Sequence, residues 1–251
     1  MVSIIMSGCN GHMGQVITRI VGERDDCEIV AGIDKFHGIE NTYPVYDEIS
    51  ECKEEADAVI DFSAPAALGG LLEYGKRTKT ALILCTTGYS DADKSAIEEA
   101  SKEIAILRSA NMSLGVNVLA KLITEAVKQL APAGFDIEIV EKHHKLKKDA
   151  PSGTALYLAD AANAGADNKY RYVFDRSQRS EKRPEDEIGI SAVRGGNIPG
   201  DHDVIFAGED EVITFSHKAY SKAVFGKGAV MAALHMKGRA PGLYDMNSVL
   251  F

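Results

Sequence analysis

Short apolar segments alternate with amphipathic segments through the first half of this chain. Each apolar run has the length of a strand buried on both faces, and each amphipathic segment carries apolar side chains at helical spacing. This alternation favours a parallel sheet with helices on both faces. The expected strands are residues 2–7, 28–33, 58–62, 81–85 and 104–107, and the expected helices are residues 13–21, 65–78 and 91–102.

The pattern changes in kind after Asn111. Turn signals at glycine and proline now separate the segments, which is typical of an α+β region. Residues 175–187 are almost wholly polar and are predicted to be a solvated loop. The expected elements are helices through 119–130, from 151 to about 162 and over 225–239, a strand at 137–140, and antiparallel strands at 191–193, 203–207 and 212–217.

These patterns predict an α/β protein of two domains, and 251 residues are enough for both. The first is a Rossmann-like doubly wound parallel sheet at 1–113, completed by 224–251. The second is an α+β domain with an open mixed sheet at 114–223.

The overall charge limits the partners that such a chain can bind. Its formal net charge is -9, whereas a broad nucleic-acid-binding surface needs an excess of positive charge. An anionic ligand therefore requires a local cationic site. No apolar run approaches the ~20 residues that span a bilayer, and the N-terminus lacks a basic leader, so we expect a soluble, cytoplasmic protein without membrane contact.

The cysteines give no sign of a metal site. None of Cys9, Cys27, Cys52 and Cys85 belongs to a Cys-x-x-Cys pair. Three of them lie in or beside apolar runs and are expected to be reduced core thiols. We predict no bound metal.

A glycine-rich segment follows the first expected strand and opens the first expected helix. Its glycines, Gly8, Gly11 and Gly14, let the backbone turn tightly and approach a pyrophosphate, which the helix N-terminus attracts. Asp34 ends the second strand 20 residues later, where a carboxylate accepts hydrogen bonds from the adenosine ribose of NAD. Lys35 could pair with the 2′-phosphate of NADP. The sequence permits NADH and NADPH, and favours NADH.

Three further strand ends carry small and hydroxylated residues. They read Asp61-Phe62-Ser63, Cys85-Thr86-Thr87-Gly88 and Ser109-Ala110-Asn111-Met112. In an open α/β sheet, ligands bind beyond the carboxyl ends of the strands. Three such ends in order predict a crevice for the cofactor.

The segment after the 137–140 strand concentrates positive charge. Residues 142–148 hold two histidines and four lysines in an otherwise acidic protein. Pro151-Ser152-Gly153-Thr154 follows and opens a helix, whose unpaired N–H groups suit a carboxylate. Cations beside a helix N-terminus predict a receptor for a compact dianion.

The chain resembles the 4-hydroxy-tetrahydrodipicolinate reductase family over nearly its whole length. The most diagnostic segment is E-K-H-H-K-L-K-K-D-A-P-S-G-T-A at 141–155. Other matching segments are S-G-C-N-G-H-M-G at 7–14, V-I-D-F-S-A-P at 59–65, T-T-G at 86–88, S-A-N-M-S-L-G-V-N at 109–117 and R-G-G-N-I-P-G-D-H at 194–202.

The resemblance implies hydride transfer from NADH or NADPH to a cyclic imine dicarboxylate, with loss of water, in lysine biosynthesis through diaminopimelate. By position, His143 and Lys147 are the catalytic proton-transfer residues, and His144, Gly153 and Thr154 bind the substrate. It also implies a homotetramer paired through the open sheet. The implied cofactor contacts are Gly8, Cys9, Asn10, Gly11, His12, Met13, Asp34, Lys35, Cys85, Thr86, Thr87, Ser109, Ala110, Asn111 and Met112.

Two positions depart from the family pattern. Cys85 replaces the first glycine of the usual Gly-Thr-Thr-Gly, and Met112 replaces the phenylalanine of Asn-Phe-Ser, which predicts altered cofactor affinity with the same reaction. Two alternatives stay open. Another NAD-dependent amino-acid dehydrogenase would not need the His143-His144 segment, and a non-catalytic NADH-binding redox sensor would usually carry a regulatory or DNA-binding segment.

Overall fold

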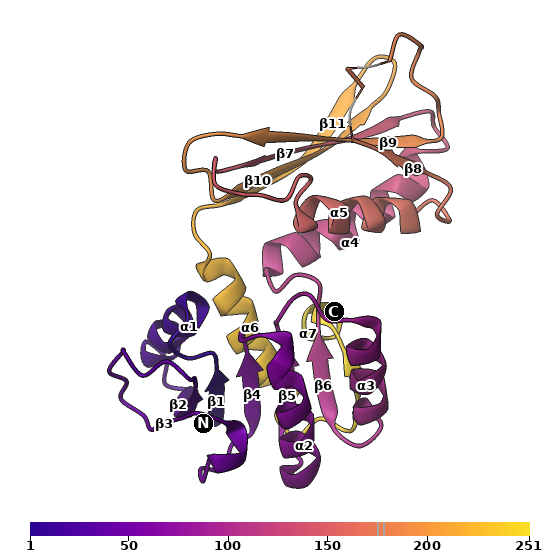
Figure 1. Cartoon of the computed structure of the whole chain (residues 1–251). Helices are drawn as coiled ribbons and strands as arrows, with labels where there is room; N and C mark the ends of the chain where they lie inside the picture. Colours follow the sequence, from indigo (N-terminus) through magenta and orange to yellow (C-terminus); the bar gives the residue numbers. More distant parts are fainter. Residues whose placement is uncertain (175, 178) are drawn as a thin grey trace. The chain divides into compact units, whose positions relative to one another are not determined.

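The computed structural model describes residues 1–174, 176–177 and 179–251. The chain divides into two compact units, drawn in Figure 1. The first unit consists of Met1–Leu114 and Ala223–Phe251, and the second of Gly115–Lys222. Each unit buries its own apolar side chains.

A seven-stranded sheet forms the centre of the first unit, and its strand pairings are parallel. The central strands are buried on both faces, which explains their continuous apolar runs. The predicted α/β sheet is confirmed. In spatial order the strands are β12 (Gly242–Tyr244), β6 (Ala105–Arg108), β5 (Ala81–Leu84), β4 (Ala58–Asp61), β1 (Val2–Ser7), β2 (Cys27–Ile33) and β3 (Val45–Tyr46).

Helices cover both faces of this sheet. Ile4 and Met6 of β1 pack into one core with α1 (His12–Gly22) and α6 (Ala223–Met236). Ile5, between them in sequence, packs into the other core with α2 (Leu68–Thr78) and α3 (Asp91–Ser101), because successive side chains of a strand point to opposite faces. The predicted doubly wound arrangement is confirmed. Shorter helical elements are η1 (Ile49–Glu51), η2 (Pro65–Ala67) and α7 (Met246–Leu250).

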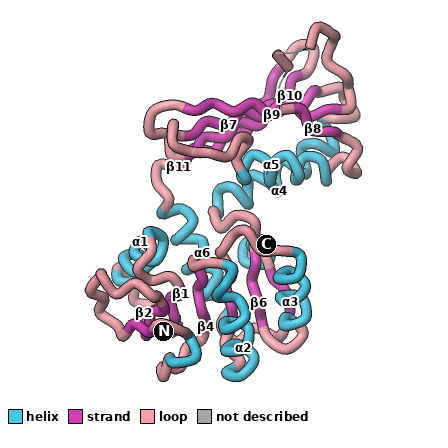
Figure 2. Tube along the Cα trace, viewed as in Figure 1, coloured by secondary structure: helices cyan, strands magenta, loops and turns pink. Residues whose placement is uncertain are grey.

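The second unit has a five-stranded sheet with two helices on one face. In spatial order its strands are β11 (Val212–Ala219), β10 (Gly200–Ala207), β7 (Asp136–His143), β9 (Glu187–Arg194) and β8 (Arg171–Val173). Helices α4 (Leu114–Leu130) and α5 (Gly153–Ala164) share a core with alternate residues of these strands, and Figure 2 shows both beside the sheet. The predicted mixed sheet is confirmed. In the part of the chain that the structure describes, no helix is both long and apolar enough to cross a bilayer.

One predicted strand direction was wrong. Residues 191–193 were expected to pair antiparallel, but β9 runs parallel to both β7 and β8. Strands β10 and β11 are antiparallel as expected. The chain between β7 and β9 contains α5, and a helical crossover of this kind brings the next strand back in the same direction.

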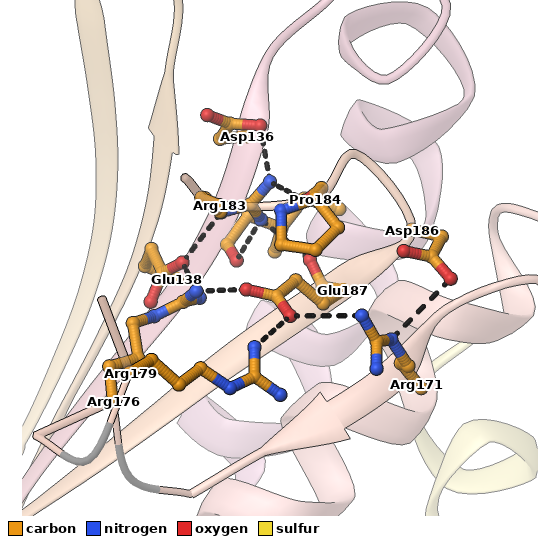
Figure 3. Close-up of polar contacts among 10 residues, drawn as sticks. Asp136, Glu138, Arg171, Arg176, Arg179, Arg183, Pro184, Asp186 and Glu187 are labelled. Atoms are coloured by element: carbon orange, nitrogen blue, oxygen red, sulfur yellow. Dashed lines mark hydrogen bonds and ion pairs between the residues drawn. The ribbon is translucent and has the colours of Figure 1, made fainter. Parts of the chain in front are cut away.

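The polar segment 175–187 is not simply a solvated loop. Figure 3 shows Arg176, Arg179 and Arg183 directed toward the carboxylates of Glu138 and Glu187. Glu187 begins β9 and is fully buried, so it requires cationic partners. The described residues before Glu187 form a largely exposed loop, as predicted. The arginine contacts and the burial of Glu187 were not predicted, because a run of charged side chains does not reveal that its partners lie on distant strands. Two residues of the segment, Asp175 and Gln178, lie outside the described residues.

Candidate functional site

Two glycines of the loop in the first unit, Gly8 and Gly14, leave no room for a side chain. Gly8 has a φ of +79°, and a Cβ there would lie 2.6 Å from the carbonyl oxygen of Phe62. A Cβ on Gly14 would lie 2.2 Å from the carbonyl oxygen of Gly8. Helix α1 starts directly after Gly11, which has no side chain to cap the first amides. The loop therefore presents helix N–H groups to a bound anion.

Asp34 lies against this loop. Its Oδ2 accepts a hydrogen bond from the backbone N–H of Asn10 at 3.0 Å, and its Oδ1 accepts one from Phe36 at 3.0 Å. Burial, with a smaller effect from Asp34, raises the pKa of the Cys9 thiol to about 11. Cys9 is therefore an uncharged core residue. Of the other predicted loop contacts, Asn10 is buried, Met13 half-buried and His12 exposed.

A cavity of about 670 Å³ opens between the glycine loop and helix α2. Its described lining includes Gly8, Gly11 and Asp34, together with Phe62 and Ser63. The volume fits part of a dinucleotide, since small-molecule sites range from about 300 to 1,000 Å³. Asp34 would meet the hydroxyls of a ribose bound there.

The rim of this cavity is acidic. Its described lining residues include Asp34, Asp47, Glu48 and Glu73, and Lys35 is the cation among them. Lys35 is exposed, and its Nζ lies 3.5 Å from Glu48. The lysine predicted to meet a 2′-phosphate is therefore already paired with a carboxylate.

A buried carboxylate joins three strand ends. Asp61, at the end of β4, accepts hydrogen bonds from Ser7 Oγ at 2.9 Å, Ser63 Oγ at 2.5 Å and Thr86 Oγ1 at 2.7 Å. Burial, and secondarily Asp61, raises the pKa of the Cys85 thiol well above its ordinary value. The sequence predicted the Asp61-Phe62-Ser63 strand end as part of the crevice but gave the Asp61 carboxylate no role of its own. Thr87, beside Thr86, is exposed.

The segment after β6, residues 109–112, is partly buried in the core of the first unit. Met112 is 4% exposed and packs among the apolar residues shared with α6. The side chain of Met112, an implied cofactor contact, therefore belongs to the core of the first unit. Asn111 Oδ1 accepts from the N–H of Ser113 at 2.8 Å, and Ser109 Oγ donates to the carbonyl of Asn111 at 3.0 Å. Ala110, between them, is exposed.

In the second unit, β7 places Glu141 and His143 on its buried face, because residues two apart in a strand share a side. Glu141 Oε2 accepts from His143 Nδ1 at 2.6 Å, and Glu141 Oε1 accepts from the N–H of Ser152 at 2.9 Å. Arg194 donates to both oxygens at 2.7 Å. Burial alone would raise the pKa of Glu141, but hydrogen bonds from Arg194, His143 and Ser152 lower it below its usual range.

His143 is 7% exposed, and its environment opposes protonation. Burial lowers its pKa, Glu141 works in the other direction, and the charges of Lys147 and Arg194 lower it further. The ring of His202 lies edge-on to it, with centroids 5.2 Å apart. Burial, then the nearby His143, lowers the pKa of His202 to about 4. His143 is thus a buried imidazole whose protonation responds to nearby charge.

The loop after β7 carries the other predicted groups. Lys147 Nζ lies 2.9 Å from the carboxylate of Asp149, and its backbone N–H donates to the carbonyl of His144 at 3.1 Å. His144 is half-buried, and its N–H donates to the carbonyl of Ile198 at 2.8 Å. The electrostatic influence of Lys147 on His143 places these two predicted catalytic residues in one neighbourhood.

Helix α5 begins beside this loop. Ser152 is its N-cap, and the Oγ accepts from the N–H of Ala155 at 3.1 Å and lies 3.0 Å from His202 Nε2. Gly153 is exposed, and a Cβ on it would meet no atom within 4 Å. Gly153 and Thr154 form the first turn, where backbone N–H groups attract a carboxylate.

The structure therefore gathers His143, Lys147 and the Gly153–Thr154 turn around Glu141. The prediction missed Glu141, Arg194 and His202 as site residues. Spacing could have found Glu141, which precedes His143 by two residues and so shares its face. Arg194 lies beside His143 only through the β7–β9 register, which local sequence does not reveal. The described residues contain no group of three His, Cys, Asp or Glu side chains placed to hold a metal ion.

Comparison with known proteins gives consistent matches over the full chain. Residues 2–112 match the family model described as dihydrodipicolinate reductase, N-terminus, and residues 115–250 match the one described as its C-terminus. A 4-hydroxy-tetrahydrodipicolinate reductase of Caldanaerobacter subterraneus subsp. tengcongensis is 52% identical over 100% of this chain and 98% of that protein. The protein of the same name from Clostridium tetani is 48% identical over 100% and 97%.

Solved structures show the same fold. Dipicolinate-bound dihydrodipicolinate reductase from Paenisporosarcina sp. TG-14 superposes with a TM-score of 0.83 at 20% identity, covering 100% of both chains. DAP dehydrogenase of C. glutamicum gives 0.58 at 14% identity, covering 98% of this chain and 92% of that one. The two family models, matched in succession, confirm the resemblance found in the sequence: this chain belongs to the dihydrodipicolinate reductase family.

Proposed function

We propose that this chain reduces 4-hydroxy-tetrahydrodipicolinate to tetrahydrodipicolinate, with loss of water, using a reduced nicotinamide nucleotide. The observation that carries the proposal is the full-length match to reductases of that name. The chain keeps a site suited to a dianion, built from the Lys147 cation, the His143 imidazole and the N-terminus of α5. Neither an unrelated amino-acid dehydrogenase nor a redox sensor accounts for that site.

The first unit would hold the cofactor. The amides at the start of α1 would bind the pyrophosphate, and Asp34 would accept hydrogen bonds from the adenosine ribose. When bound, the nicotinamide supplies the hydride. Thr86, held by Asp61, and the 109–112 strand end would line the rest of the crevice.

The second unit would bind the substrate and supply the proton. The N–H groups of Gly153 and Thr154 and the side chain of His144 would bind the carboxylates. Hydride addition to the conjugated imine leaves negative charge on the acceptor. Lys147 and His143 would stabilise that charge, and one of them would donate the proton.

We propose NADH as the preferred cofactor. The carboxylates of Asp34, Asp47, Glu48 and Glu73 around the cavity would repel the two negative charges of a 2′-phosphate. Lys35 would have to leave Glu48 to pair with that phosphate. Both effects disfavour NADPH without affecting the shared ribose contacts.

We also propose a homotetramer paired through the open sheet of the second unit. Helices α4 and α5 cover one face of that sheet. The register places Val212 and Val193 on the other face, where they are 62% and 46% exposed. The 176–183 arginines contact Glu138 and Glu187 on part of this face, and the two valines stay exposed beside them. Exposed apolar side chains on a sheet face are typical of a protein–protein interface.

The direct test is oxidation of NADH in the presence of freshly generated 4-hydroxy-tetrahydrodipicolinate. We expect substrate-dependent loss of NADH absorbance and slower turnover with NADPH. Aspartate and homoserine serve as control substrates in the reverse direction with NAD. Turnover of a control alone would favour the dehydrogenase alternative, and NADH binding without any turnover would favour the sensor.

A further inference from the structure

Glu141 occupies an unusual position for a carboxylate in a site meant for a dianion. Its side chain is fully buried and receives donors from three elements: His143 on its own strand, Arg194 on β9 and the Ser152 amide at the start of α5. An ionised group that deep in a protein persists only when it is fully hydrogen-bonded. The four hydrogen bonds from these donors meet that requirement.

We propose that Glu141, neutralised by Arg194, is the positioning residue that fixes the His143 ring and the N-terminus of α5 relative to each other. This inference rests on the proposed function, in which His143 takes part in proton transfer and the start of α5 binds a substrate carboxylate. Glu141 itself would touch neither the substrate nor the cofactor.

The hydrogen bond to His143 determines which ring nitrogen is available. An ionised carboxylate can only accept, so Nδ1 of His143 must carry the proton. Nε2 is then the nitrogen left to exchange a proton with a ligand. A carboxylate behind a histidine fixes both its tautomer and its ring orientation.

The second oxygen of Glu141 reaches the anion-binding turn. Oε1 accepts the N–H of Ser152, the residue directly before Gly153 and Thr154. One carboxylate group therefore contacts the proton-transfer residue and the carboxylate-binding turn at the same time. Movement of the turn relative to the histidine would require one of these hydrogen bonds to break.

Arg194 completes the arrangement in two ways. Its guanidinium pairs with both oxygens of Glu141, which cancels a negative charge that would otherwise repel the substrate. Its Nη2 also donates to the backbone carbonyl of Asp149 at 2.5 Å, and the Asp149 carboxylate holds Lys147. The Glu141–Arg194 ion pair therefore contacts His143 directly and is linked to Lys147 through Asp149.

The test compares Glu141→Gln with Glu138→Gln. Each variant removes a carboxylate of β7 that pairs with arginine. Glu138 pairs with Arg176 and Arg183 and has no contact with His143. We expect Glu141→Gln to lower kcat about 10- to 100-fold, as loss of supporting hydrogen bonds does at other sites, with an unchanged Kd for NADH. Glu138→Gln should leave kcat unchanged.

A double-mutant cycle separates positioning from stability. In a His143→Gln background, Glu141→Gln should cause almost no further loss of kcat, although its effect on the melting temperature should persist. An equal loss of kcat in both backgrounds would overturn the positioning role and leave the proposed function intact. Full activity of His143→Gln alone would instead contradict the catalytic assignment of His143.

The pH profile adds a readout that a purely structural role would not move. His143 faces Glu141 on its own strand, Lys147 in the following loop, Arg194 on β9 and His202 on β10. Glu141 is the group that favours protonation of His143. The limb on which activity falls with rising pH should therefore move to lower pH in Glu141→Gln, and an unmoved limb would argue against the link.

A spectroscopic measurement on the unaltered protein covers the case in which Glu141→Gln does not fold. Nitrogen-15 spectra of labelled histidines, assigned with the His143→Gln variant, should show neutral His143 protonated at Nδ1. Protonation at Nε2 would overturn the proposal. This result does not depend on which substrate the enzyme reduces.

Discussion

At the scale of single residues, His143 is the proposed proton-transfer residue, and its replacement tests that role. Replacing it with glutamine keeps a polar side chain but removes a group that can transfer a proton at neutral pH. We expect kcat to fall about 10²- to 10⁴-fold, with NADH binding unchanged. Single-turnover kinetics and a fluorescence titration of NADH would measure the two effects. His235→Gln on α6 is the matched control, and equal losses in both variants would contradict the assignment.

Replacement of Asp34 with alanine tests the proposed cofactor site. Alanine there removes the acceptor proposed for the ribose hydroxyls and also one carboxylate from the acidic rim. Binding of NADH should weaken about tenfold, in line with the loss of a hydrogen bond to a charged group. Binding of NADPH should weaken less, because repulsion of its 2′-phosphate is relieved at the same time. Titration of both nucleotides against the variant decides this, and equal losses would refute the ribose contact.

His202 makes the stability of the protein depend on pH. Its pKa is lowered from 6.5 to about 4 by burial, so between these values the unfolded state binds the proton and the folded state does not. Stability should fall as pH drops through that window, by about 3 kcal/mol in total from this group, and should lose nothing more from it below pH 4. Urea unfolding of the protein and of His202→Gln at pH 7, 5.5 and 4 should show a flatter dependence in the variant.

At the scale of elements, the N-terminus of α5 links stability to binding. Ser152→Ala removes the cap on Ala155 and should cost about 1 kcal/mol. Because the same turn is proposed to bind a substrate carboxylate, the KM for the substrate should rise as well. Ser90→Ala removes the equivalent cap from α3 in the first unit. It should lower stability similarly without changing KM, and a KM change in both variants would separate α5 from substrate binding.

The elements also show what the sequence could predict. Strands β1, β2, β4, β5 and β6 were placed within one or two residues, because burial on both faces requires continuous apolar runs. Strands β3, β8 and β12 were missed, because two or three residues at a sheet edge carry no periodicity. The direction of β9 was wrong because strand pairing depends on the crossover, which local pattern does not encode.

The residues of the candidate site also differ in how far the sequence reveals them. Glycines, Asp34 and the His143 segment were predicted because their chemistry is visible in consecutive residues. Glu141 was missed because its neighbours Lys142 and His143 make it look like part of an exposed charged run. Only the alternation of β7 and the register with β9 show that Glu141 is buried and that Arg194 meets it.

At the scale of the whole molecule, the open sheet face predicts the assembly. A homotetramer should have four times the 27.0 kDa of one chain by light scattering after size exclusion. Val212→Asp places a charge on the exposed face of β11, and burying it in a subunit contact would be strongly unfavourable. The variant should dissociate into smaller species. Val118→Asp on α4, where the valine is 38% exposed on the helical side of the same unit, should keep the native mass. A native protein that runs as a monomer would rule out the assembly, whereas dissociation by Val118→Asp alone would move the interface to the helices.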